Sequence, residues 1–248
     1  MAEAIEKSDT IEFEPWYGEF GWEVATWAPW CRKQAAGYKN VVVTSFEGMG
    51  PLYADFATEF RSCGPAKRGL NYIKRYRPDG LYYRYGRKEG CEYFFDGLIH
   101  ARGIGRKRAI NYRNWDGFLT ARRKLPVVFA CIGTKEDSRV GDLIDCRGIG
   151  LQELMDLISR AKVVVGVSSG IMHLAAFCGT DIVTWGDRRT YFGETLEQRY
   201  KITWNPFNVR VGWIDADDFQ PQPQQIVEKV KEITGYEIIT AQYPASAW

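Results

Sequence analysis

The sequence predicts an α/β protein in which helices cover parallel β-sheets. Short apolar runs that suit strands alternate with stretches of helical spacing along most of the chain. The runs at residues 41–43 and 163–167 consist almost entirely of Val, as expected for buried parallel strands. A length of 248 residues with 45% hydrophobic residues suits one large domain or two small ones.

The N-terminal part predicts a small unit of strand, helix, strand and helix. Strands are expected at residues 11–14 and 41–43, and helices at 22–36 and 52–60. Pro29 lies inside the first helical pattern, where it either kinks the helix or marks a boundary. Gly37 is placed to end that helix.

After residue 92 the alternation predicts a larger second unit. Strands are expected at residues 94–100, 127–132, 142–145, 163–167 and 182–185, and helices at 116–125, 151–161, 170–178 and 224–233. The predicted domains are therefore an abbreviated N-terminal lobe, residues 1–92, and a fuller C-terminal lobe, residues 93–248.

Overall composition excludes several classes of protein. The formal net charge of +2 does not indicate a polyanionic partner. The first ten residues are polar and unlike a secretory signal, and no run approaches the roughly 20 apolar residues of a membrane span. Six scattered Cys and two His argue against a structural zinc site. We expect reduced thiols and a cytoplasmic location.

Residues 67–88 break the alternation with eight Lys or Arg against one acid, interleaved with Tyr. Cations among aromatic rings suit phosphates and stacked bases, so this region suggests a nucleic-acid-binding or DNA-modifying protein as an alternative. A solvated surface whose tyrosines pack into the lobe is an equally simple interpretation. Steep loss of binding with added salt would indicate nucleic acid.

The segment Ser168-Ser169-Gly170 stands between a predicted buried strand and a predicted helix. A helix that starts at the carboxyl edge of a parallel sheet offers free amide groups and the positive end of its dipole to an anion. Gly170 allows a ligand to approach the backbone, and His173 falls on the first turn. The alternative is that a Ser caps the helix and His173 is packed in the core.

The surrounding stretch, LQELMDLISRAKVVVGVSSGIMHLAAFCGTDIVTWGD, resembles the C-terminal signature of the heptosyltransferase-like glycosyltransferases, or glycosyltransferase family 9. This resemblance implies a GT-B-like architecture of two Rossmann-like lobes, with a nucleotide-sugar as the sugar donor. It also implies that Ser169, Gly170 and His173 hold the diphosphate of that donor. Ser168 replaces the usual Asp and Asp181 the usual Pro, and the first change puts any contact of that carboxylate in doubt.

Further positions follow from the same resemblance. The segment GLIHARGIGRKRAINYRNW fits the opening of the family's second lobe, and its loop begins with His100 and Arg102. Arg113 takes the place of a cation that stabilises the leaving phosphate, as charge-assisted contacts do. Glu136 takes the place of a ribose-binding carboxylate. Arg102, Arg113, Glu136 and Ser168 are thus expected to join the donor site.

The family also places a carboxylate on the loop after its first strand, here WYGEFGWEVATWAPW. Glu23 aligns best with this general base, and Glu19 is its rival. A helix-terminal Glu stabilised by the dipole is the simpler alternative. The family usually inverts configuration, which implies a single displacement at the sugar and an acceptor that supplies a hydroxyl, whether carbohydrate, anionic molecule or nucleic acid.

Asp215-Ala216-Asp217 has the D-x-D spacing of a metal site in the other major glycosyltransferase fold. We interpret Asp217 or the neighbouring Asp218 instead as a polar lead-in to the last helix and expect neither a metal nor a cofactor. The short first lobe and Ser168 leave a non-catalytic family member as a further alternative.

Overall fold

The computed structural model describes residues 9–66, 84–85, 95–103, 111–191 and 193–236. Contacts divide the chain into two compact units: the first ends at Arg84 and also includes Gly150–Glu153, and the second takes up the rest from Tyr85 onward. The boundary predicted at residue 92 and nearly all of the basic segment 67–88 lie outside the described residues. No helix in the described ranges is long and apolar enough to cross a membrane.

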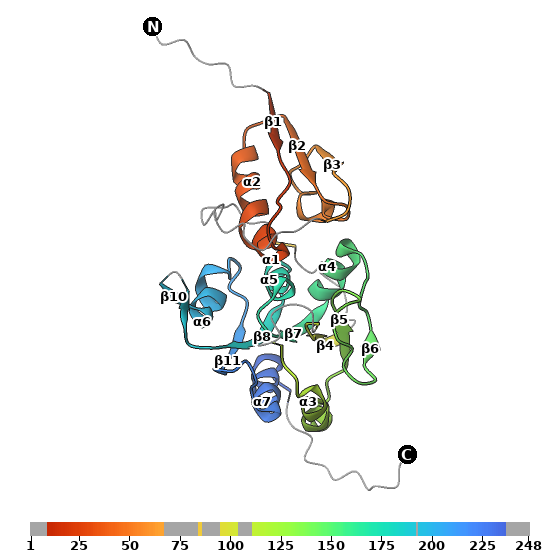
Figure 1. Cartoon of the computed structure of the whole chain (residues 1–248), viewed down its shortest axis with the longest axis vertical. Helices are drawn as coiled ribbons and strands as arrows, with labels where there is room; N and C mark the ends of the chain where they lie inside the picture. The colour runs from red at the N-terminus through yellow and green to blue at the C-terminus, as the bar shows by residue number, and fades with distance from the viewer. Residues whose placement is uncertain (1–8, 67–83, 86–94, 104–110, 192, 237–248) are drawn as a thin grey trace. The chain divides into compact units, whose positions relative to one another are not determined.

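The first unit contains a three-stranded parallel sheet. Its strands β1 (Thr10–Phe13), β2 (Asn40–Ser45) and β3 (Glu59–Ser62) lie side by side in that order. The apolar residues of β2 are buried, which explains why the Val run predicted this strand correctly. The helix α2 (Ala28–Ala35) lies beside the sheet in Figure 1, and its Trp30 ring contacts Phe13 of β1 with centroids 6.1 Å apart.

The single helix predicted at residues 22–36 is three consecutive helical pieces. The α-helical turn α1 (Phe20–Trp22) is followed by the π-helical η1 (Glu23–Trp27) and then by α2. Pro29 lies at the start of α2, directly after the π-helical turn passes into the α-helix. Pro29 therefore marks a boundary, which was one of the two predicted possibilities.

The helix predicted at residues 52–60 is wrong. The chain makes the short 3₁₀ helix η2 (Gly50–Leu52), a turn, and then the edge strand β3. Thr58 fixes this path, because its amide and hydroxyl both donate to the carbonyl oxygen of Val41, and its hydroxyl also accepts the Val41 amide. The long-range bonds to β2 override the local helical spacing.

The second unit is built on a six-stranded sheet in which all neighbouring strands are parallel. In spatial order its strands are β11 (Val211–Asp215), β8 (Asp181–Gly186), β7 (Ala161–Gly166), β4 (Phe95–His100), β5 (Phe129–Ile132) and β6 (Ile144–Asp145). The predicted α/β class with parallel sheets is confirmed. From β4 the chain proceeds to β5 and β6 on one side and later returns to β7 on the other.

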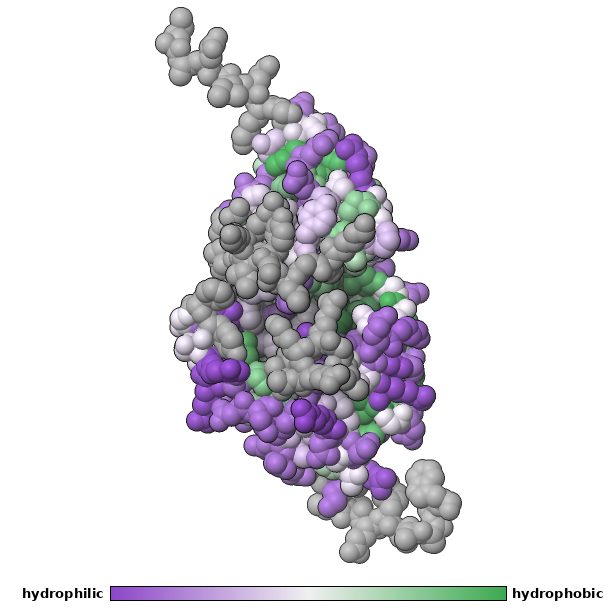
Figure 2. Space-filling model, viewed as in Figure 1, coloured by the Kyte–Doolittle hydropathy of each residue, from purple (hydrophilic) through white to green (hydrophobic). Residues whose placement is uncertain are grey.

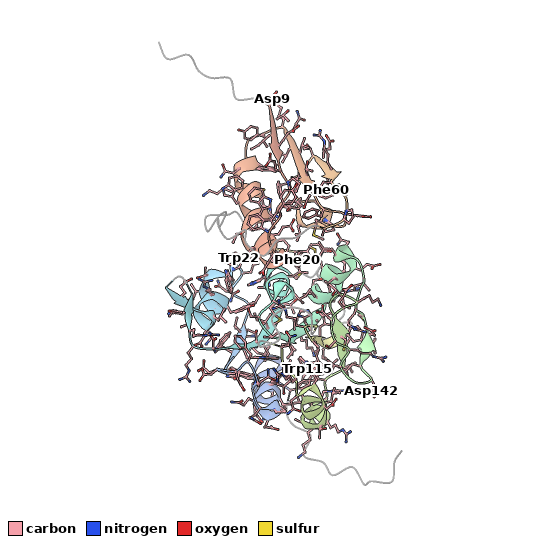
Figure 3. The ribbon with its side chains drawn as sticks, in the orientation of Figure 1. Asp9, Phe20, Trp22, Phe60, Trp115 and Asp142 are labelled. Atoms are coloured by element: carbon pink, nitrogen blue, oxygen red, sulfur yellow. The ribbon has the colours of Figure 1, made fainter. Side chains whose placement is uncertain are left out.

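Helices cover both faces of this sheet (Figure 1). They are α3 (Trp115–Ala121), α4 (Leu151–Ser159), α5 (Gly170–Phe177) and α7 (Pro223–Thr234), with the 3₁₀ turn η5 (Arg122–Lys124) after α3. The helix α7 packs against α3, β8 and β11, whereas α5 packs against β7 and β8. Trp115 at the start of α3 (Figure 3) contacts the rings of Tyr112 and Trp185.

Several elements of the second unit were not predicted from the sequence. They are the antiparallel hairpin β9 (Thr190–Tyr191) and β10 (Glu194–Thr195), the turn α6 (Leu196–Gln198), the π-helical η6 (Arg199–Thr203) and the edge strand β11. The D-x-D begins at Asp215, the last residue of β11, whereas Asp217 and Asp218 lie in a turn between β11 and α7. Asp215 pairs with Arg188 at 2.9 Å. Hydrophilic residues dominate the visible surface around these elements in Figure 2.

Candidate functional site

Three strand ends meet at the carboxyl edge of the second unit's sheet. His100 ends β4, and β4 lies between β5 and β7, with His100 in register with Ile132 and Gly166. Because the chain leaves β4 in one direction and returns on its other side, the junction of β4 and β7 is a topological switch point. Open α/β sheets bind their ligands outside such a point.

Ser169 begins α5 directly after β7. Its backbone is extended, with φ −163° and ψ 169°, and its carbonyl oxygen accepts the amides of Met172 and His173. The Ser169 hydroxyl does not cap its own helix; its Oγ lies 3.0 Å from Nδ1 of His100. No side chain caps the first turn of α5, which suits an anion that would approach the amides of Gly170 and Ile171.

His100 is only 4% exposed and connects Ser169 to a carboxylate. Its Nε2 lies 3.3 Å from Oδ2 of Asp137, which follows β5. Asp137 also accepts the amides of Gly103 and Thr134, each at 2.8 Å. Burial would raise the pKa of Asp137, but its hydrogen bonds, the one with His100 foremost, hold that pKa well below its ordinary value. Asp137 is thus an ionised anchor for His100.

Two further groups surround Ser168. The hydroxyl of Tyr200, on η6, donates to Oγ of Ser168 at 3.0 Å, and Nη1 of Arg102 donates to the Ser168 carbonyl oxygen at 3.4 Å. Burial raises the pKa of Tyr200 to about 12, so its hydroxyl stays protonated. Arg102 is half-buried and brings a permanent positive charge to the start of α5.

His173 lies on α5 among aromatic rings. It stacks on Tyr200 with an interplanar angle of 1° and meets Trp204 edge-on, with centroids 4.6 Å apart. Burial lowers the pKa of His173 to about 4. Its buried Nδ1 has no hydrogen-bond partner within the described part of the chain. Any contact of His173 with an anion would therefore come from a neutral ring.

The structure places Arg102, Ser168, Ser169, Gly170 and His173 around the start of α5, but not the two other expected residues. Arg113 is exposed, and its backbone amide donates to Gln220 Oε1 at 3.0 Å. Glu136 is exposed as well, whereas the neighbouring Asp137 points to His100. The contacts of all seven residues to a sugar donor stay predictions.

Sequence reasoning did not assign roles to His100, Asp137 or Tyr200. His100 was visible only as a residue at a strand end, and Asp137 as the neighbour of Glu136. The signal that separates Asp137 from Glu136 is Gly133, whose φ of +131° sets the turn in which Asp137 Oδ2 accepts the Thr134 amide. Tyr200 lies in a segment with no predicted element.

The two candidate bases lie in the first unit. Glu23, on η1, is 0% exposed, and its Oε1 accepts hydrogen bonds from Ser45 at 3.0 Å and from Tyr53 at 2.6 Å. Burial and the charge of Glu23 raise the pKa of Tyr53 well above its ordinary value, so this donor stays protonated. Glu19 is half-buried at the residue before α1. Glu19 is the more accessible carboxylate of the two.

Residues 146–232 match the family model of glycosyltransferase family 9 (heptosyltransferase). No curated protein matches the chain in sequence. Escherichia coli ADP-heptose LPS heptosyltransferase II has a similar structure, with a TM-score of 0.60 and 12% identity over 91% of this chain and 98% of that one. The iron-containing dodecameric glycosyltransferase TibC of enterotoxigenic E. coli H10407 is similar with a TM-score of 0.53 and 12% identity, over 91% of this chain and 77% of that one.

At such identity the two structures show a shared fold. TibC contains iron, but no group of three or more His, Cys, Asp and Glu side chains that could hold a metal occurs in the described ranges of this chain. Together the family match and the fold confirm the resemblance predicted from the sequence: this chain is a glycosyltransferase of GT-B-like α/β fold, and its residues 146–232 match glycosyltransferase family 9.

Proposed function

We propose that this glycosyltransferase moves a sugar from a nucleotide-sugar to an acceptor hydroxyl by metal-independent, inverting displacement. The observation that carries the proposal is the junction of β4 and β7, where Arg102 and the start of α5 offer positive charge at a topological switch point. A diphosphate bound there would be stabilised as it leaves the sugar. Two structural relatives are described with ADP-heptose, so ADP-linked sugars are the first probes.

Binding of nucleoside diphosphates tests the donor site. We expect ADP, UDP, GDP or CDP to bind more tightly than its monophosphate, measured by isothermal titration calorimetry. Arg102→Gln removes one charge-assisted contact and should weaken binding by about 10-fold or more. The matched control is Arg123→Gln, which removes an exposed arginine on η5. Equal affinities of the Arg102 and Arg123 variants would contradict the site.

Arg113 remains a proposed stabiliser of the leaving phosphate. If it acts only in the transition state, Arg113→Gln lowers kcat for release of the nucleoside diphosphate and leaves the Kd of that diphosphate unchanged. Glu136 remains a proposed ribose contact. Glu136→Gln should weaken the binding of nucleoside diphosphates but not that of inorganic pyrophosphate.

For the base we propose Glu19 or Glu23, and the burial of Glu23 favours Glu19 as the carboxylate that an acceptor reaches. Replacing the true base with Gln should lower turnover by about 100-fold to 10,000-fold, measured as hydrolysis or transfer of the nucleotide-sugar. If Glu23 is structural, its replacement with Gln should instead lower the melting temperature. If both variants keep full turnover, neither residue is the base.

A further inference from the structure

Asp137, His100 and Ser169 form one hydrogen-bonded line across the ends of three adjacent strands. Asp137 follows β5, His100 ends β4 and Ser169 follows β7, so the line crosses the switch point. The two connecting distances are 3.3 Å from Asp137 Oδ2 to His100 Nε2 and 3.0 Å from His100 Nδ1 to Ser169 Oγ. Each group therefore constrains the proton of the next.

For a neutral His100 ring and no ligand, the hydrogen-bond inventory allows one arrangement of the protons. Ionised Asp137 only accepts, so the hydrogen bond to it requires a proton on Nε2 of His100. A neutral imidazole then has a lone pair on Nδ1, and the hydroxyl of Ser169 donates its single proton to it. In this state the Ser169 oxygen presents lone pairs and no proton to an incoming phosphate, which is unfavourable for an anion.

We infer that binding of a diphosphate at the start of α5 is coupled to protonation of His100, which turns the Ser169 hydroxyl into a donor to phosphate. The inference rests on the proposed function, since it assumes that the anion is a nucleotide diphosphate. A proton from solvent adds to Nδ1 of His100, and the new N–H donates to Ser169 Oγ. The Ser169 proton is released from Nδ1 and points to a phosphate oxygen, while Nε2–H keeps its bond to Asp137.

The charges around His100 allow this step. Asp137 faces it from the loop after β5 and stabilises a positive ring. Arg102, on the loop after β4, opposes protonation, as does Arg147, whose guanidinium donates to the carbonyl oxygen of Asp137. From α5 and η6 the neighbouring groups are neutral His173 and protonated Tyr200. The added charge of the phosphate then favours the imidazolium. His100 and Asp137 are positioning residues in this scheme, because they act through Ser169.

The sign of the pH dependence follows directly. The complex holds one more proton than the free protein, so affinity falls as the pH rises over the range in which binding takes up that proton. In that range Kd rises by up to about 10-fold per pH unit. If His100 has only a structural role, His100→Gln should change the affinity by the same factor at every pH.

The first test needs no ligand. The chain has two histidines, so ¹⁵N-labelled histidine gives two ring systems by NMR, and His173→Gln assigns them. We expect the ring of His100 in the free protein to be the neutral tautomer protonated on Nε2. A neutral ring protonated on Nδ1 would overturn the inference whether or not a nucleotide binds, because Ser169 could then already donate outward.

The second test counts protons on binding. Titration calorimetry with ADP, or whichever nucleoside diphosphate binds, is run in Tris and in HEPES at about pH 8, where the terminal phosphate is fully ionised. We expect uptake of up to one proton by the wild type. Both His100→Gln and Ser169→Ala should bind more weakly, without uptake and without the slope of Kd against pH. Arg123→Gln, which changes an exposed residue on η5, is the control and should keep both.

The outcomes separate the inference from the function. Binding without proton uptake, or an unchanged pH slope in His100→Gln, overturns the inference and leaves the proposed function standing. No binding of any nucleoside diphosphate overturns both. Covalent labelling of Ser169 by a fluorophosphonate would show that His100 acts as a base toward a nucleophilic serine, and this result also overturns the inference.

Discussion

The two histidines of the second unit have opposite electrostatic surroundings. His100 is held between the carboxylate of Asp137 and the hydroxyl of Ser169, which can stabilise either protonation state. His173 stacks on Tyr200 and meets Trp204 edge-on, and burial there favours the uncharged ring. One residue type therefore provides a hydrogen-bonded group at the end of β4 and a neutral packing group on α5.

The buried His173 should make stability depend on pH in a defined window. Its pKa is about 4 in the folded chain against an ordinary value of 6.5, so below pH 6.5 the unfolded chain binds a proton that the folded chain does not. Stability is full above pH 6.5 and falls by up to about 3 kcal/mol as the pH drops toward 4. His173→Gln should remove this part of the slope.

Urea unfolding of the wild type and of His173→Gln across this window measures the effect. The variant loses ring contacts at every pH, so a constant offset between the two curves is expected in any case. The informative quantity is the change in that offset with pH. An offset that stays constant from neutral pH to about pH 4.5 would show that His173 titrates normally in the folded state.

At the scale of elements, the sequence predicted the strands that carry a run of Val or Ile and missed β3 and β11, which carry no such run. The strands β2, β7 and β8 carry such runs and were predicted. The edge strand β3 is largely exposed and is held by its ladder to β2, which leaves no apolar pattern in the sequence. The helix from residue 22 was predicted as one piece because a single π-helical turn interrupts the α-helical spacing of its apolar residues only briefly.

Gly97 in the middle of β4 shows how closely this sheet is packed. A Cβ at Gly97 would overlap the ring of Phe129, which is 2% exposed and packs against Phe118. Because that ring cannot move aside freely, Gly97→Ala should lower the free energy of unfolding by about 1–3 kcal/mol. Gly150→Ala is the matched control, since the nearest atom to its Cβ would be 3.7 Å away.

Unfolding by urea, followed by tryptophan fluorescence, compares the two alanine variants. If Gly97→Ala is as stable as Gly150→Ala, the ring of Phe129 does not pack against Gly97 as closely as described above.

At the scale of the whole molecule, the local half of the site could be predicted and the non-local half could not. Ser168, Ser169, Gly170 and His173 are contiguous in a strand-to-helix junction, so one stretch of sequence contains their relation. His100 reaches them only because β4 pairs with β7 across 66 residues of chain at His100 and Gly166. Which strands become neighbours is decided by long-range packing, which local pattern does not encode.

The order β7-β4-β5 leads to a prediction about the entire chain. A diphosphate that binds at this edge should protect three stretches, 98–103, 132–138 and 166–173, from hydrogen exchange at the same time. Their bonds are interlocked, since the amides of Gly103 and Thr134 both donate to Asp137, which also pairs with His100. At a ligand concentration of about 100 times Kd, opening costs about 2.7 kcal/mol more, which slows exchange by about 100-fold.

Hydrogen-exchange mass spectrometry with and without a nucleoside diphosphate makes this measurement, and the ladder of β2 in the first unit serves as the internal reference. We expect the rates of β2 to stay constant while the three stretches slow together. Protection confined to 166–173 would mean that the anion contacts only the start of α5, and that Asp137 and His100 take no part in binding. Coordinated protection requires the three strand ends to act as one site, which follows from the sheet order and from nothing contiguous in the sequence.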